Sequence, residues 1–110
     1  GGPGGMTIQA LKAVLDRTGV PFAYRKWERG EAPKLPYGVY YAGPSNPFAA
    51  DGVVYSSSQR YTLEVYSRDK DPELEARVEA ALTQAEIFFE KDEEYLESEH
   101  MNEIIYGIEV

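Results

Sequence analysis

Carboxylates are the residues in this sequence whose number and spacing could do chemistry. They gather near the C-terminus in an acidic run that could share a hard cation, because Ca²⁺ is bound by several carboxylate oxygens. The run lacks the Asp-x-Asp-x-Asp-Gly order and the distant glutamate of an EF-hand loop. We therefore interpret it as a solvated charged turn at residues 90–94, with a weak metal site as the alternative. Its acids are Glu90, Asp92, Glu93, Glu94, Glu97 and Glu99.

Other reactive groups are scarce. The chain has no cysteine and a single histidine, His100, which excludes thiol nucleophiles, thiolate metal sites and a histidine pair. Gly38 and Gly43 fit no glycine-rich phosphate-binding order. A small hydrolase using buried carboxylates is a minor hypothesis, because no acid is marked as desolvated or paired. The sequence predicts no catalytic residue, no metal ligand and no cofactor, so we expect a protein that is not an enzyme.

The formal charge of −8 is divided unevenly along the 110 residues. Residues 1–70 hold nine Lys and Arg against six Asp and Glu, whereas residues 71–110 hold two against thirteen. An acidic half argues against specific nucleic-acid binding, since a phosphate backbone requires clustered cations. One interpretation is a solvated surface that keeps the protein soluble. The other is head-to-tail association, in which the acidic half of one subunit meets the more basic half of the next.

Nine tyrosines are the other unusual feature, and nearly all of them fall in expected strands. Ordinary packing of a sheet explains many of them. Exposed tyrosines are also enriched in protein interfaces, so an interface is the second interpretation. The tyrosines are Tyr24, Tyr37, Tyr40, Tyr41, Tyr55, Tyr61, Tyr66, Tyr95 and Tyr106.

The clearest structural elements lie between residues 60 and 85. Tyr61, Leu63 and Val65 recur at the two-residue period of a strand with one buried face. Asp71 and Pro72 then supply an N-cap oxygen and a first helical residue, and apolar residues follow at helical spacing up to residue 85. We expect this strand, turn and helix to form the centre of the core.

The remaining pattern predicts a helix over residues 7–18 and strands over 22–28 and 37–42. A third run starts at 53–55 and leads into the strand at 60–66, and further strands are predicted over 87–89, 95–99 and 101–110. The last strand is expected beside the one at residues 60–66, and residues 44–52 form a long loop. The predicted fold class is α+β: an antiparallel sheet of strands of mixed length with two helices packed on one face, in the order α-β-β-β-α-β-β-β.

The length fits one domain over residues 6–110, with residues 1–5 interpreted as a leftover of recombinant expression. No window holds the roughly 18 consecutive apolar residues of a membrane span. We therefore expect no contact with a membrane, and a location inside the cell that makes the protein.

Eight stretches of the chain together carry a resemblance to a known family: residues 18–24, 32–33, 35–40, 46–55, 60–66, 71–75, 98–99 and 105–110. They resemble small prophage proteins of Gram-positive bacteria, encoded among the head–tail genes of long-tailed phages. The family includes tail terminator, tail completion and head–tail joining proteins. The likeness covers nearly all of residues 6–110.

The resemblance implies an α+β subunit that self-associates into a ring, commonly a hexamer, at the virion tail or head–tail interface after assembly in the host cytoplasm. Its partners would be the tail tube protein and head connector proteins, and it brings no catalytic motif. The competing hypothesis is a small acidic binding module that mimics nucleic acid and blocks a basic host protein. For the ring we expect the loop carrying Phe48 to contact a neighbouring protein. The expected interface residues are Tyr41, Pro44, Asn46, Pro47, Phe48, Asp51, Glu93 and Glu94.

Overall fold

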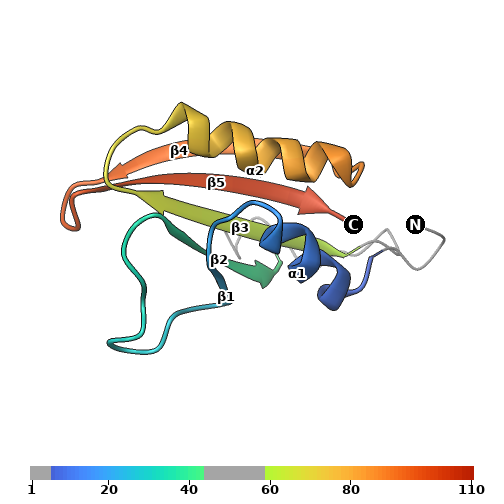
Figure 1. Ribbon diagram of the computed structural model, residues 1–110, viewed down its shortest axis with the longest axis horizontal. Helices are drawn as coiled ribbons and strands as arrows, with labels where there is room; N and C mark the ends of the chain where they lie inside the picture. Colours follow the sequence, from blue (N-terminus) through green and yellow to red (C-terminus); the bar gives the residue numbers. More distant parts are fainter. Residues whose placement is uncertain (1–5, 44–58) are drawn as a thin grey trace.

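The computed structural model describes residues 6–43 and 59–110, which form two helices and one five-stranded sheet (Figure 1). Strand order across the sheet is β1-β2-β3-β5-β4. Both helices lie on the same face of this sheet, which confirms the α+β class. In chain order the elements are α1 (Ile8–Asp16), β1 (Phe22–Tyr24), β2 (Tyr37–Ala42), β3 (Arg60–Ser67), α2 (Pro72–Gln84), β4 (Phe89–Leu96) and β5 (Met101–Glu109).

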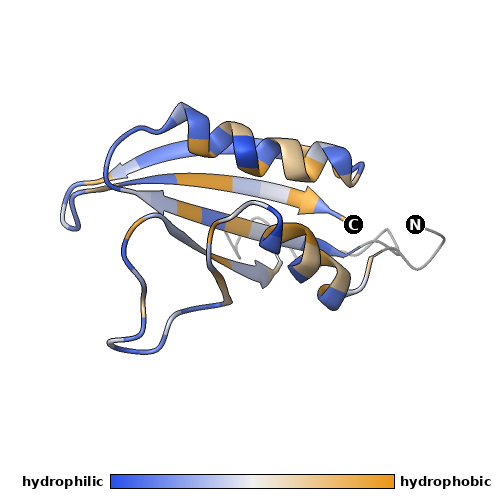
Figure 2. Ribbon diagram, in the orientation of Figure 1, coloured by the Kyte–Doolittle hydropathy of each residue, from blue (hydrophilic) through white to orange (hydrophobic). Residues whose placement is uncertain are grey.

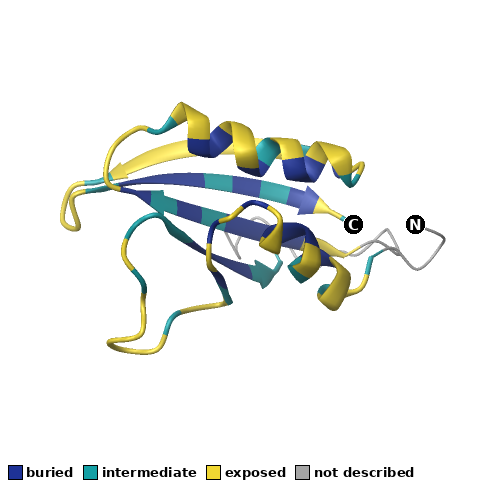
Figure 3. Cartoon of the chain, viewed as in Figure 1, coloured by how far each residue is buried: buried dark blue, intermediate teal, exposed yellow. Residues whose placement is uncertain are grey.

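The core lies between the helices and the sheet face that they cover. Alternate residues of β3 and β5 point to this face, as the two-residue period of a strand requires. Figures 2 and 3 show the resulting apolar, buried stripes, and each fully buried side chain contributes about 1.5–3 kcal/mol. The largest buried side chains are Leu11 and Leu15 of α1, Val78 and Leu82 of α2, Leu63 and Val65 of β3, and Ile104, Tyr106 and Ile108 of β5.

Both helices begin after an N-cap side chain, and for α2 this is the Asp71 cap predicted from the sequence. The Thr7 hydroxyl accepts a hydrogen bond from the Ala10 N–H at 3.1 Å, and the Asp71 carboxylate accepts one from the Leu74 N–H at 3.1 Å. Pro72 occupies the first turn of α2. The predicted helix at residues 7–18 is therefore confirmed as α1, slightly shortened.

The predicted neighbours β3 and β5 lie side by side and antiparallel. Tyr61 faces Ile108, Leu63 faces Tyr106 and Val65 faces Ile104. Because these pairs are buried, they fix the register: a shift by one residue would turn every apolar side chain to the opposite face.

The sheet is mixed, so the prediction of a purely antiparallel sheet is wrong. β1 runs parallel to β2, with Phe22 opposite Gly38. Residues 25–36 return the chain to the same end of the sheet, a crossover of about the dozen residues that a parallel pair requires. β1 is also shorter than the predicted strand 22–28. Arg25 has a φ of 69°, and the Lys26 N–H donates to the Tyr24 carbonyl, so the chain turns away after Tyr24.

The predicted element order is wrong in the C-terminal part. The expected strand at 87–89, charged turn at 90–94 and strand at 95–99 are replaced by one strand, β4, followed by a turn at residues 97–100. The acidic run is tolerated in a strand because β4 lies at the edge of the sheet, where side chains remain in water (Figure 3). The expected loop at 44–52 and the third run at 53–55 lie outside the described residues.

Two strand glycines provide a matched test of this packing. A Cβ at Gly38 would lie 2.5 Å from the Phe22 ring and 2.9 Å from the Glu64 carbonyl oxygen, whereas a Cβ at Gly107 would meet only Arg60 at 4.0 Å. We expect Gly38→Ala to lower the free energy of unfolding by about 1–3 kcal/mol through overpacking. Gly107→Ala should be neutral or stabilise by up to about 1 kcal/mol. Chemical denaturation of both variants checks this, and equal effects would contradict the packing described.

Candidate interaction surface

The structure separates the interface residues expected from the sequence. Tyr41 lies on the helix-free face of the sheet in β2, and its hydroxyl donates to Glu64 at 2.7 Å. Glu94 is exposed on the same face of β4, whereas Glu93 points to the helix-covered face. Pro44, Asn46, Pro47, Phe48 and Asp51 lie outside the described residues.

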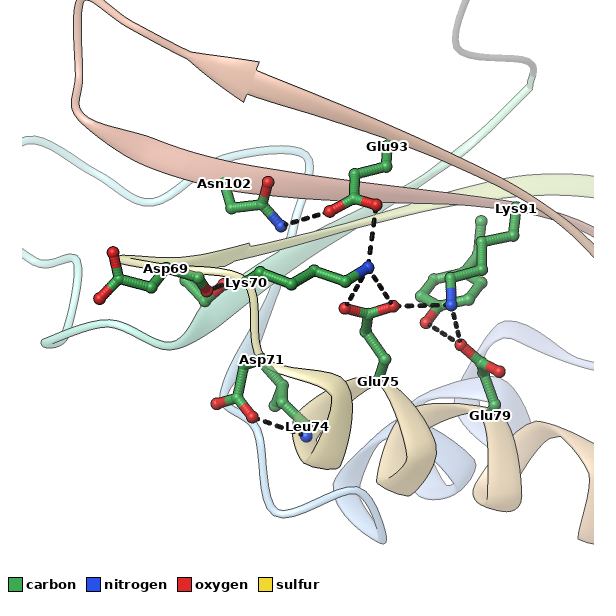
Figure 4. Close-up of polar contacts among 11 residues, drawn as sticks. Asp69, Lys70, Asp71, Leu74, Glu75, Glu79, Lys91, Glu93 and Asn102 are labelled. Atoms are coloured by element: carbon green, nitrogen blue, oxygen red, sulfur yellow. Dashed lines mark hydrogen bonds and ion pairs between the residues drawn. The ribbon is translucent and has the colours of Figure 1, made fainter.

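A polar network joins the edge strand β4 to α2 (Figure 4). At its centre is Glu75, a carboxylate only 5% exposed. The Lys91 ammonium lies 2.7 Å from one oxygen of Glu75 and 2.7 Å from Glu79. The Lys70 ammonium lies 2.9 Å from the other oxygen of Glu75 and 2.9 Å from Glu93. Two lysines therefore compensate a carboxylate whose burial alone would cost several kcal/mol.

The outer members of this network are held in their charged forms. Burial acts against ionisation of Glu79, but hydrogen bonds from Lys91 and Tyr106 outweigh it and keep the pKa of Glu79 below its usual value. Hydrogen bonds to Glu75 and Glu79 raise the pKa of Lys91. The network is therefore an ionic attachment of β4 to the helix layer.

A second polar group lies on the helix-free face, over the centre of the sheet. The Glu64 carboxylate accepts hydrogen bonds from the hydroxyls of Tyr41 and Tyr66, each at 2.7 Å. Glu103 is buried nearby on β5 and faces Glu94 of β4 directly across the ladder. Burial, followed by the negative charges of Glu64 and Glu94, raises the pKa of Glu103 above its ordinary value. This face therefore gathers carboxylates that repel one another.

Exposed aromatic side chains mark both edges of the sheet. Phe88, next to the start of β4, is 91% exposed, and Tyr95 near the end of β4 is 53% exposed. On the opposite edge, Tyr24 of β1 is 41% exposed, with the Arg25 guanidinium 5.9 Å from its ring centre. These three are the exposed large apolar side chains of residues 6–43 and 59–110. Exposed aromatics of this kind are typical of interface centres.

The two edges also carry opposite charges. We call the β4 edge the acidic edge, because Glu90, Asp92 and Glu94 point to water on its helix-free face. We call β1 and the segment after it the basic edge, since the exposed Arg25, Lys26 and Arg29 outnumber the exposed acids Glu28 and Glu31 there. Within the described part of the chain these three cations are in no salt bridge.

Sequence reasoning identified the acidic run but placed it in a turn, and it missed Phe88 and Tyr24 as surface residues. Phe88 stands between Ile87 and Phe89, so the local composition predicted a strand at 87–89 and did not mark Phe88 as exposed. The large number of tyrosines suggested an interface but did not show where on the surface it lies. Only the strand order shows that these aromatics lie on opposite edges.

Comparison with known proteins yields no further assignment: no family model, curated protein or solved structure matched the chain. Among the described residues, no three His, Cys, Asp or Glu side chains are placed to hold a metal ion. None of the described helices is both long and apolar enough to cross a membrane.

Glu75 offers a test of the ionic attachment. We expect Glu75→Ala to speed hydrogen exchange of the β4 amides and to destabilise the fold by about 1–3 kcal/mol, since it removes the partner shared by Lys70 and Lys91. Glu73→Ala is the matched control, because Glu73 occupies the same first turn of α2 but is exposed. Equal exchange rates in the two variants would show that β4 does not depend on the network.

Glu103 gives a pH-dependent prediction. Its pKa in the folded state lies above that of a free glutamate. Its favourable contribution to the free energy of unfolding is therefore present at pH values below the free-glutamate pKa and is lost as the pH rises through the folded-state pKa. Glu103→Gln should therefore exceed the original protein in stability by about 0.5–1 kcal/mol at neutral pH. The difference should vanish near about pH 4. Denaturation curves measured across this pH range check the prediction, with the exposed position Glu97→Gln as the control. If Glu103→Gln shows no pH-dependent increase in stability, the prediction is refuted.

Proposed function

We propose that this chain is a structural protein of the phage head–tail region, a tail terminator or head–tail joining protein that acts by ring assembly. The observation that supports it is the placement of opposite charges, each with an exposed aromatic, on opposite edges of one sheet. A ring subunit needs two different, complementary surfaces, because a head-to-tail contact closes only when each copy offers both. The family resemblance suggests six copies.

The surface chemistry also suits passage of DNA. Glu90, Asp92 and Glu94 form a row of exposed carboxylates on one face of β4. Placed towards the channel of a ring, such a row repels phosphates and lets a genome pass without binding. The remaining surfaces would contact the tail tube protein and head connector proteins. In this proposal the chain acts in the virion and changes no substrate.

The same row of acids favours a second candidate, a binding module that mimics nucleic acid. Alternate residues of a strand are about 6.8 Å apart, so Glu90, Asp92 and Glu94 present regularly spaced negative charges. Such a row could occupy the nucleic-acid groove of a basic host protein. Retention of one basic partner from a host lysate, without self-association at high protein concentration, would favour this function over the ring.

Deletion of the corresponding gene in a phage separates the roles. Electron microscopy should show tails of uncontrolled length for a terminator, or full heads beside detached normal tails for a joining protein. Sedimentation of the purified protein should also show oligomers that dissociate as salt rises towards about 1 M, because exposed charge pairs are screened. Normal infectious particles without the protein would reject the proposed function.

A further inference from the structure

The geometry points to a specific joint between copies: we propose that the acidic edge of one subunit pairs with the basic edge of the next, continuing the sheet from copy to copy. The inference rests on the proposed function, because it names the contact that would build the ring. Within the described residues, β4 pairs only with β5 and β1 only with β2. Both outer strands therefore have backbone groups directed away from the sheet, which can accept another strand; on β1 the Tyr24 carbonyl already accepts from the Lys26 N–H, so the other outward groups would make the joint.

Strand directions favour this pairing. β1 is parallel to β2, and the following neighbours β3, β5 and β4 alternate in direction, so β4 runs opposite to β1. A second copy placed beside the first in the same orientation brings β4 and β1 together as an antiparallel pair, the more stable arrangement.

The register of the joint follows from the rows of the sheet. Ala23 is level with Asp92, because the ladders link them through Val39, Glu64 and Ile105. In a closed ring, neighbouring copies are not shifted relative to one another along the strand direction. Asp92 of one copy then faces Ala23 of the next. Two residues further, Arg25 follows β1 and comes level with Glu90.

Charge excludes the simplest competing partner, a symmetric pairing of two acidic edges. Such a contact would bring Glu90, Asp92 and Glu94 against the same residues of the other copy, and like charges opposite one another destabilise a ladder. Lys91, the only cation of β4, is already engaged by Glu75 and Glu79. The acidic edge therefore requires a basic partner, and the basic edge of a second copy supplies Arg25, Lys26 and Arg29.

Tyr24 adds apolar area to the joint. It lies on the helix-covered face and, in this register, is level with Lys91 of the neighbouring copy. Tyr95 lies on the same face four residues further along β4, so the two rings do not face each other. Phe88 lines a hollow of about 470 Å³ at the start of the acidic edge. Because β1 is only three residues long, the joint contains few strand-to-strand hydrogen bonds.

Site-directed disulfides test the joint, because the chain has no cysteine of its own. Opposed residues in an antiparallel pair have Cβ atoms about 4.5–5.5 Å apart, near the range a disulfide spans. Ala23→Cys protein is mixed with Asp92→Cys protein under mild oxidation, and the mixed dimer is measured on non-reducing gels. The matched control replaces Asp92→Cys with Ala80→Cys, an exposed small position on α2. Circular dichroism of each variant confirms folding.

We expect the Ala23–Asp92 pair to cross-link about tenfold faster than the control, because the contact raises the local concentration of the two thiols. Equal rates overturn the joint. Should Ala23→Cys fail to fold, Arg25→Cys with Glu90→Cys is the second pair, since both positions are exposed and level. For this pair too, a rate equal to that of the Ala80→Cys control overturns the joint.

The result is separable from the proposed function. If deletion disrupts phage particles but neither cysteine pair cross-links faster than its control, the joint is wrong and the structural role stands. If the pairs cross-link but phage assembly proceeds without the protein, the chain self-associates through these edges and the head–tail role is rejected.

Discussion

The fold depends on the compensation of one buried carboxylate, Glu75. Lys70 and Lys91 reach it from the turn before α2 and from β4, so three elements meet at one pair of oxygens (Figure 4). β4 carries charge on both faces, and Phe89 is its side chain that packs against the core, with its ring centre 5.4 Å from that of Tyr106. The backbone ladder to β5 and this ionic network hold the edge strand in place.

The same network determines the charge that the edge presents. Lys91 is the only cation of β4, and the network directs it inward to Glu75 and Glu79. The helix-free side of the strand is left with Glu90, Asp92 and Glu94, of which Glu90 lies 3.8 Å from the Arg60 guanidinium of β3. This ion pairing and the surface charge are thus linked, because the contacts of Lys91 with Glu75 and Glu79 both stabilise the strand and leave its outer edge acidic.

The fold was largely predictable where hydrophobic pattern and capping agree. The β3 period, the Asp71-Pro72 start of α2 and the pairing of β5 with β3 were read from residues 60–110, because buried faces impose a strict alternation. The acidic run was misread for the opposite reason. A charged strand at a sheet edge has no buried face to reveal it, and charge runs are more often solvated turns.

The sequence by itself determined the α+β class, the two helices on one face, the absence of cysteine chemistry and the imbalance of charge along the chain. Tertiary structure alone decided that β1 runs parallel to β2, that β4 is one continuous strand, and that Tyr24 and Phe88 lie on opposite edges. Local propensity acts within a few residues, whereas strand order is set by which distant segments bury each other. The division of the molecule into acidic and basic edges is therefore a property of the assembled sheet.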